Sequence, residues 1–102
     1  MDDLKTYIAD NQQRFLDELF ELIRIPSISS ESKHRPDMYR AAEQWKKILL
    51  DGGADKAVVM ETAGNPVTYG EKVLDASYPT VLVYGHMDVM PVDPLNLWDT
   101  DF

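Results

Sequence analysis

The sequence contains no cysteine. Disulfide bridges, thiolate zinc sites and cysteine nucleophiles are therefore excluded, and His, Asp and Glu remain as possible metal ligands. Long apolar runs are also absent, and without 18 consecutive apolar residues no segment is predicted to cross a membrane. The opening residues Met1-Asp2-Asp3-Leu4 lack the basic and apolar regions of a secretory signal. These absences together predict a cytoplasmic protein.

Basic residues are scarce. Ten Lys and Arg stand against 18 Asp and Glu, which leaves a net charge of -8 over 102 residues. Nucleic acids and anionic membranes are bound through clustered Lys and Arg, so we expect neither as a partner. An acidic enzyme that holds divalent cations would have such a composition. The length allows one small domain, and an apolar fraction of 44% is sufficient for a packed core.

Two helices are predicted in the first half of the chain. From about Asp3 to Arg24, apolar residues recur at helical spacing, and Pro26 ends this amphipathic pattern. Residues 27–35 form a polar loop rich in serine. The second helix is predicted to begin at Pro36, which suits a first helical position, and to stop at Gly52-Gly53.

Three strands are predicted in the second half. Ala57–Met60 is a short buried strand, Val67–Val73 is a weaker one, and Thr80–Tyr84 has the strongest strand pattern. The last run is entirely apolar, which indicates burial on both faces, as in a sheet covered by helices. We therefore predict an α/β fold with helices packed on a mixed sheet.

The segment after Gly85 has no regular pattern. Residues 91–98 contain two prolines and several large apolar side chains. If Trp98 and Phe102 had no partners, each would forfeit roughly 1.5–3 kcal/mol of burial free energy. We therefore expect the 102 residues to be part of a longer protein.

A histidine and an aspartate follow the predicted third strand. His86 and Asp88 come after Gly85, and ligand sites in α/β sheets gather at the carboxyl ends of strands. An extended backbone would place both side chains on one side, with Cα atoms roughly 7 Å apart. Imidazole is a good ligand for zinc, and a neighbouring carboxylate can orient its ring. An ordinary hydrogen-bonded pair is the alternative, since a zinc site needs at least three protein ligands.

Other chemistry-bearing groups have simpler interpretations. His34, the only other histidine, is predicted to be solvated or to cap the second helix. The serines near it could suggest a nucleophilic hydrolase, but the sequence contains no G-x-S-x-G motif. Acidic pairs such as Asp2-Asp3 lie on predicted helix surfaces, where solvation explains them.

Residues 85–94, followed by Leu97-Trp98, resemble a known family. They are similar to the dinuclear zinc peptidases that include carnosinase-type dipeptidases, aminoacylases and desuccinylases. Residues 25–29, residues 34–38 and Gly64-Asn65-Pro66 are similar to other segments of that family. The resemblance covers almost the full chain, and it is closest to the dipeptidase branch.

This resemblance implies a role for each member of the pair. The residue matching His86 binds one of two zinc ions, and Mn²⁺ or Co²⁺ would suit the same imidazole. The residue matching Asp88 belongs to the catalytic machinery without being a ligand, because it steadies that imidazole. The other expected groups are two aspartates, a glutamate pair that includes the general base, and a distant histidine, all outside these 102 residues.

The resemblance also implies what the protein does. Residues 1–102 would be the N-terminal portion of a partial zinc-peptidase catalytic domain, without the lid domain through which many relatives dimerise. The homodimeric parent would cleave short peptides or N-acyl amino acids with a metal-activated water. We expect the isolated chain to be inactive and to bind metal weakly. Two alternatives are a non-catalytic scaffold domain and, among enzymes, an aminoacylase or desuccinylase.

Overall fold

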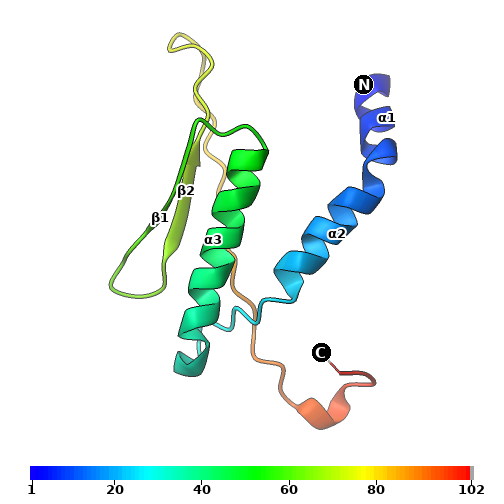
Figure 1. Cartoon of the computed structure of the whole chain (residues 1–102), viewed down its shortest axis with the longest axis vertical. Coiled ribbons are helices and arrows are strands. Elements are labelled where there is room, and N and C mark those ends of the chain that lie inside the picture. Colours follow the sequence, from blue (N-terminus) through cyan, green and yellow to red (C-terminus); the bar gives the residue numbers. More distant parts are fainter. Residues whose placement is uncertain (102) are drawn as a thin grey trace.

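The computed structural model describes residues 1–101, so Phe102 lies outside the described residues. Helices occupy the first half of the chain and a β-hairpin follows (Figure 1). Short 3-10 helices occur at Ser32–His34 and Leu95–Leu97. The main elements in chain order are α1 (Asp2–Asp10), α2 (Gln12–Ile23), α3 (Arg35–Asp51), β1 (Lys56–Met60) and β2 (Val67–Glu71).

The predicted first helix is present as two helices, α1 and α2, separated at Asn11. This residue has φ -110° and ψ 8°, and its side-chain Nδ2 donates a hydrogen bond to the Tyr7 carbonyl at 2.8 Å. The Asn11 backbone amide donates to the same carbonyl at 3.1 Å, so the side-chain bond caps the end of α1 beside the backbone bond. Neither helix contains a buried residue within the described chain, and both extend away from α3 in Figure 1. The predicted apolar stripe is therefore largely exposed, with only Phe15 and Leu22 partly covered.

The second predicted helix, α3, has the expected ends. Pro36 lies in its first turn, where a missing N–H costs nothing. At its other end the Ala54 and Gly53 amides donate to the carbonyls of Leu49 and Leu50, at 2.9 and 3.0 Å. These two bonds form a Schellman motif, with Gly53 at a φ of 97° that favours glycine. The helix buries Met38, Ala41 and Ala42.

Helix α3 packs on one face of the β1–β2 hairpin, as Figure 1 shows. The strands are antiparallel, with Ala57 opposite Gly70 and Met60 opposite Val67. The Thr68 hydroxyl donates to the Ala42 carbonyl of α3 at 2.9 Å. A Cβ atom at Gly70 would lie 2.9 Å from Cδ1 of Leu49, so helix and strand approach closely there. The predicted helix α3 and these two strands are therefore present. However, β2 ends at Glu71 rather than at Val73, and of the strand predicted to be buried only Ala57 is buried.

The predicted third strand, Thr80–Tyr84, is wrong for this structure. Residues 80–84 form no strand, and their apolar side chains are exposed, from 82% at Val81 to 89% at Tyr84. A strand needs a hydrogen-bonded neighbour, and within residues 1–101 this segment has none. The sheet described is consequently antiparallel and two-stranded, and the mixed sheet is not observed in this part of the chain.

The core is small and lies where three segments meet. It is formed by Ile25 and Ile28 after α2, by one face of α3 and by Ala57 of β1. The radius of gyration is 16.7 Å, whereas about 13 Å is typical of a compact domain of 100 residues. The difference reflects the outward course of α1 and α2 and of the last residues. None of the described helices has the length and apolar character needed to cross a membrane.

Candidate metal-ligand site

The candidate site is built where the loop after α2 meets the segment around Asp88. Ser27 forms two of the connections: its carbonyl accepts from the Val89 amide at 3.0 Å, and its hydroxyl donates to the Met87 carbonyl at 2.9 Å. An isolated parallel bridge pairs Ile28 with Val89. Ser27 is only 2% exposed, so these bonds are shielded from water. Segments about 60 residues apart are thereby held side by side.

His86 and Asp88 face each other at hydrogen-bonding distance. The Nδ1 atom of His86 lies 3.0 Å from Oδ1 of Asp88 and 3.2 Å from its carbonyl oxygen. Both oxygens only accept while the carboxyl is ionised, so a neutral ring carries its proton on Nδ1. The lone pair is then on Nε2, the nitrogen available to a metal ion. The two residues singled out by the sequence therefore form a pair, and metal binding by His86 stays a prediction.

A third residue, Ser29, completes this arrangement and was missed by the sequence analysis. Its hydroxyl donates to Oδ2 of Asp88 at 2.5 Å, across 59 residues of sequence. The hydrogen bond from Ser29, and after it the one from His86, holds the pKa of Asp88 below its ordinary value of 3.8. Asp88 is thus ionised at neutral pH. Ser29 was visible only as part of a serine-rich loop, and no spacing rule links that loop to Asp88.

Of these residues, His86 is the one suited to bind a metal ion, as a single ligand of a larger site. His86 is 77% exposed at its side chain, and its Nε2 is oriented by the bond that Nδ1 makes. In residues 1–101 no three His, Asp or Glu side chains come together in a group that could hold a metal ion. Asp88 has both oxygens engaged, which suits support of the imidazole rather than coordination.

His34 does not contribute to this site. Of the two predicted alternatives, solvation or capping, the position agrees with the second, and the side chain is partly covered rather than fully solvated. Its side chain is 19% exposed, with Nδ1 2.8 Å from Oδ2 of Asp37 and Nε2 3.7 Å from Oε2 of Glu31. It occupies the N-cap position of α3 without a side-chain hydrogen bond to the helix backbone. The ring packs between two carboxylates because residues 34 and 37 lie one helical turn apart.

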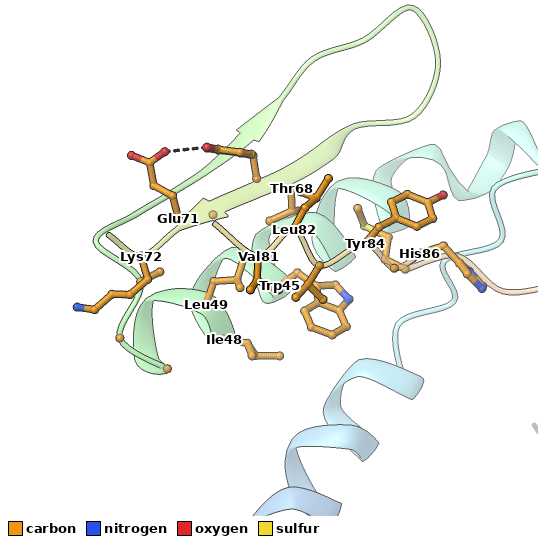
Figure 2. Close-up of a pocket in the computed structure, with 18 residues that line it drawn as sticks. Trp45, Ile48, Leu49, Thr68, Glu71, Lys72, Val81, Leu82, Tyr84 and His86 are labelled. Carbon is orange, nitrogen blue, oxygen red and sulfur yellow. Dashed lines mark hydrogen bonds between the residues drawn. The ribbon is translucent and has the colours of Figure 1, made fainter. Parts of the chain in front are cut away.

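A pocket of about 800 Å³ adjoins His86. Trp45 and Leu49 of α3, Thr68 of β2 and the segment from Val81 to Met87 line it, and Figure 2 shows His86 at one end of that segment. Its walls are largely apolar. Residues 81–84, which line one side of it, form no strand with β2.

The chain is similar to several curated dipeptidases. It is 27% identical to the Cys-Gly metallodipeptidase of Schizosaccharomyces pombe over 99% of this chain and 23% of that protein. It is 32% identical to the cysteinylglycine-S-conjugate dipeptidase of Corynebacterium striatum over 92% of this chain and 21% of that protein. The Cys-Gly metallodipeptidase of Saccharomyces cerevisiae is 28% identical, with 86% and 21% covered.

Other comparisons give no match: no family model matches the chain, and no solved structure matches it. The chain spans about a fifth of the length of the curated relatives it matches. Similarity to three of them nevertheless extends over most of its residues, in agreement with the family resemblance of residues 85–94. Over nearly its whole length, the chain is a distant homologue of the Cys-Gly metallodipeptidases.

Proposed function

We propose that this chain is the N-terminal part of the catalytic domain of a metal-dependent dipeptidase, and that His86 is one of its metal ligands. The observation that carries the proposal is the hydrogen bond between Nδ1 of His86 and Oδ1 of Asp88 at 3.0 Å. This bond leaves Nε2 as the ligand atom and makes the imidazole a stronger donor. The homology to metallodipeptidases supports the same assignment.

Each residue has a distinct role in this proposal. His86 holds one ion through Nε2, and Asp88 keeps the proton on Nδ1 and the ring in place. Bound metal, two Zn²⁺ ions or alternatively Mn²⁺ or Co²⁺, supplies a water of lowered pKa and polarises the scissile carbonyl. The remaining ligands and the general base come from outside the 102 residues. A homodimeric parent is part of the same proposal.

The substrates proposed for the parent are dipeptides. The names of the relatives specify cysteinylglycine and its S-conjugates, so a small dipeptide with C-terminal glycine is the first one to test. N-acyl amino acids are the alternative substrate class. The isolated chain is proposed to hydrolyse neither, because a single imidazole does not make a catalytic metal site.

Metal binding is tested by adding Zn²⁺ to the purified 102-residue chain and following the ¹H and ¹⁵N resonances of both histidines. We expect the Nε2 resonance of His86 to respond at lower Zn²⁺ concentration than that of His34, which carboxylates flank. His86→Ala should abolish the stronger response, and His34→Ala serves as the matched control. Equal responses from both rings, or loss of binding only in His34→Ala, would contradict the assignment.

Activity is tested separately on the same preparation. With saturating Zn²⁺, Mn²⁺ or Co²⁺, we expect no hydrolysis of Cys-Gly above that of a metal-only control. Release of glycine by the wild-type chain but not by His86→Ala would show that the chain alone is competent, and it would overturn this part of the proposal.

A further inference from the structure

We infer that Ser29 is a positioning residue for the His86 imidazole and that it acts through Asp88. The three side chains form a continuous series, from the Ser29 hydroxyl to Oδ2 of Asp88 at 2.5 Å and from Oδ1 to Nδ1 of His86 at 3.0 Å. This role rests on the proposed function only in so far as it concerns metal binding. The hydrogen-bonded series itself can be tested without a metal.

The need for positioning follows from the exposure of the site. His86 is 77% exposed, so packing does little to restrict its ring. Asp88 is 39% exposed, and a carboxylate held through one oxygen could rotate about its Cβ–Cγ bond. The second bond, from Ser29, engages the other oxygen and removes that freedom. Because the acceptor is charged, this bond is stronger than one between neutral groups.

Ser29 can act in this way because the backbone immediately before it is anchored. The preceding residues Ser27 and Ile28 are buried, and both are paired with the segment that carries Asp88. The backbone bonds join the two segments, and the Ser29 hydroxyl sets the orientation of the carboxylate between them. The loop after α2 therefore determines which nitrogen of His86 faces outward.

The expected effect is a change in tautomer and in metal affinity. Without the Ser29 hydroxyl, Asp88 turns away for part of the time and the Nε2–H tautomer of His86 becomes more populated. Partners that orient a metal-binding histidine directly are typically worth about 10- to 100-fold in metal affinity. Ser29 acts one bond further away, and we expect Zn²⁺ binding at His86 to weaken roughly 3- to 10-fold.

The first measurement is the tautomer of neutral His86 in the metal-free chain, from long-range ¹H–¹⁵N spectra recorded well above the ordinary imidazole pKa of about 6.5. Ser29→Ala should lower the Nδ1–H population and Ser29→Thr should restore it. Ser30→Ala should change nothing, since Ser30 is exposed and makes no hydrogen bond among residues 1–101. Asp88→Ala removes the carboxylate itself and gives the largest change in the Nδ1–H population to be expected.

A tautomer population that is the same in Ser29→Ala and wild type, but altered in Asp88→Ala, would overturn the inference. Should alanine disturb the loop, Thr and Val at position 29 give the same contrast, because they share a shape and differ in the hydroxyl. Zn²⁺ titration of each variant then separates the two proposals. If the resonances of wild-type His86 do not respond to Zn²⁺ while Ser29→Ala still changes its tautomer population, the proposed function fails and the positioning role stands.

Discussion

At the scale of single residues, a histidine hydrogen-bonded to an aspartate occurs at two places, and the two histidines differ in their exposure. His34 lies between the carboxylates of Asp37 and Glu31 and is largely covered, whereas His86 has one carboxylate partner and an exposed ring. Nδ1 of His34 is hydrogen-bonded to Asp37 and its Nε2 faces the carboxylate of Glu31 at 3.7 Å, whereas Nε2 of His86 faces no carboxylate among the described residues. Local surroundings, rather than residue type, thus distinguish a structural histidine from a candidate ligand.

Asp37 provides a test at this scale. The hydrogen bond from His34, followed by the one from Arg40, holds its pKa below the ordinary value of 3.8. A carboxyl whose pKa is lower in the folded than in the unfolded chain stabilises the fold at a pH above its unfolded pKa. This contribution to stability is lost as the pH falls through the folded pKa. Asp37→Asn should therefore reduce stability at pH 7, and the deficit should shrink below pH 3.8.

The measurement is urea unfolding of both chains from pH 7 downward. Asp10→Asn, at the exposed end of α1, serves as the control and should follow the wild type throughout. A deficit for Asp37→Asn that stays constant into strong acid would show that the pair with His34 has no part in stability.

At the scale of elements, α3 is the part whose ends and packing are best defined. Its Schellman motif requires Gly53 at a φ of 97°, and its contact with β2 requires Gly70 beside Leu49. The requirement at Gly53 concerns its own backbone conformation, whereas the one at Gly70 concerns the packing of α3 on β2. Substitution of each glycine separates the two contributions.

Gly53→Ala should lower the free energy of unfolding by about 1 kcal/mol, because alanine disfavours a positive φ. Gly64→Ala is the matched control, since Gly64 has no positive φ and an added Cβ would meet only the Thr62 hydroxyl, at 3.9 Å. Equilibrium urea unfolding measures both. Equal losses at the two positions would mean that the helix end does not depend on the conformation of Gly53.

Gly70→Ala should cost about 1–3 kcal/mol through overpacking against Leu49. Combining it with Leu49→Ala should give a loss smaller than the sum of the two single losses, because the second substitution removes the clashing atoms. Additive losses in this double-mutant cycle would show that the close approach of α3 and β2 is not maintained in solution.

At the scale of the whole molecule, stability is unevenly distributed. The described core joins the loop after α2, α3 and the hairpin, while α1 and α2 contain no buried residue within residues 1–101. Hydrogen-bonded helices without tertiary burial open at little cost in free energy. The candidate site belongs to the stable part, because Ser27 and Ile28 tie it to the core.

Hydrogen exchange followed by mass spectrometry should show this difference directly. We expect the amides of α1 to exchange within the dead time of the experiment, those of α2 soon after, and those of α3, β1 and β2 at least about 100-fold more slowly. The side-chain hydrogen bond between α2 and α3, from Gln44 to Glu21 at 3.1 Å, is exposed and should add little protection. Uniform protection from α1 through β2 would contradict an α1–α2 segment without tertiary burial.

Local signals in the sequence predicted much of this architecture. Pro26, Pro36 and the pair Gly52-Gly53 act through their own backbone conformations, so the limits of α3 and the end of α2 could be predicted without knowledge of any distant contact. The break at Asn11 was not predicted, because the apolar residues keep their helical spacing on both sides of it. The strand predicted at residues 80–84 failed because pairing depends on a neighbour rather than on the apolar residues themselves.

The candidate site divides in the same way. The sequence by itself determined that His86 and Asp88, two residues apart, can form an imidazole–carboxylate pair, because their separation is set by the backbone. Only the tertiary structure decided that Ser29 completes the pair, since a hydrogen bond across 59 residues depends on how the loop after α2 packs beside residues 87–89. Short-range geometry is carried by the chain itself, whereas long-range geometry exists only once the core has formed.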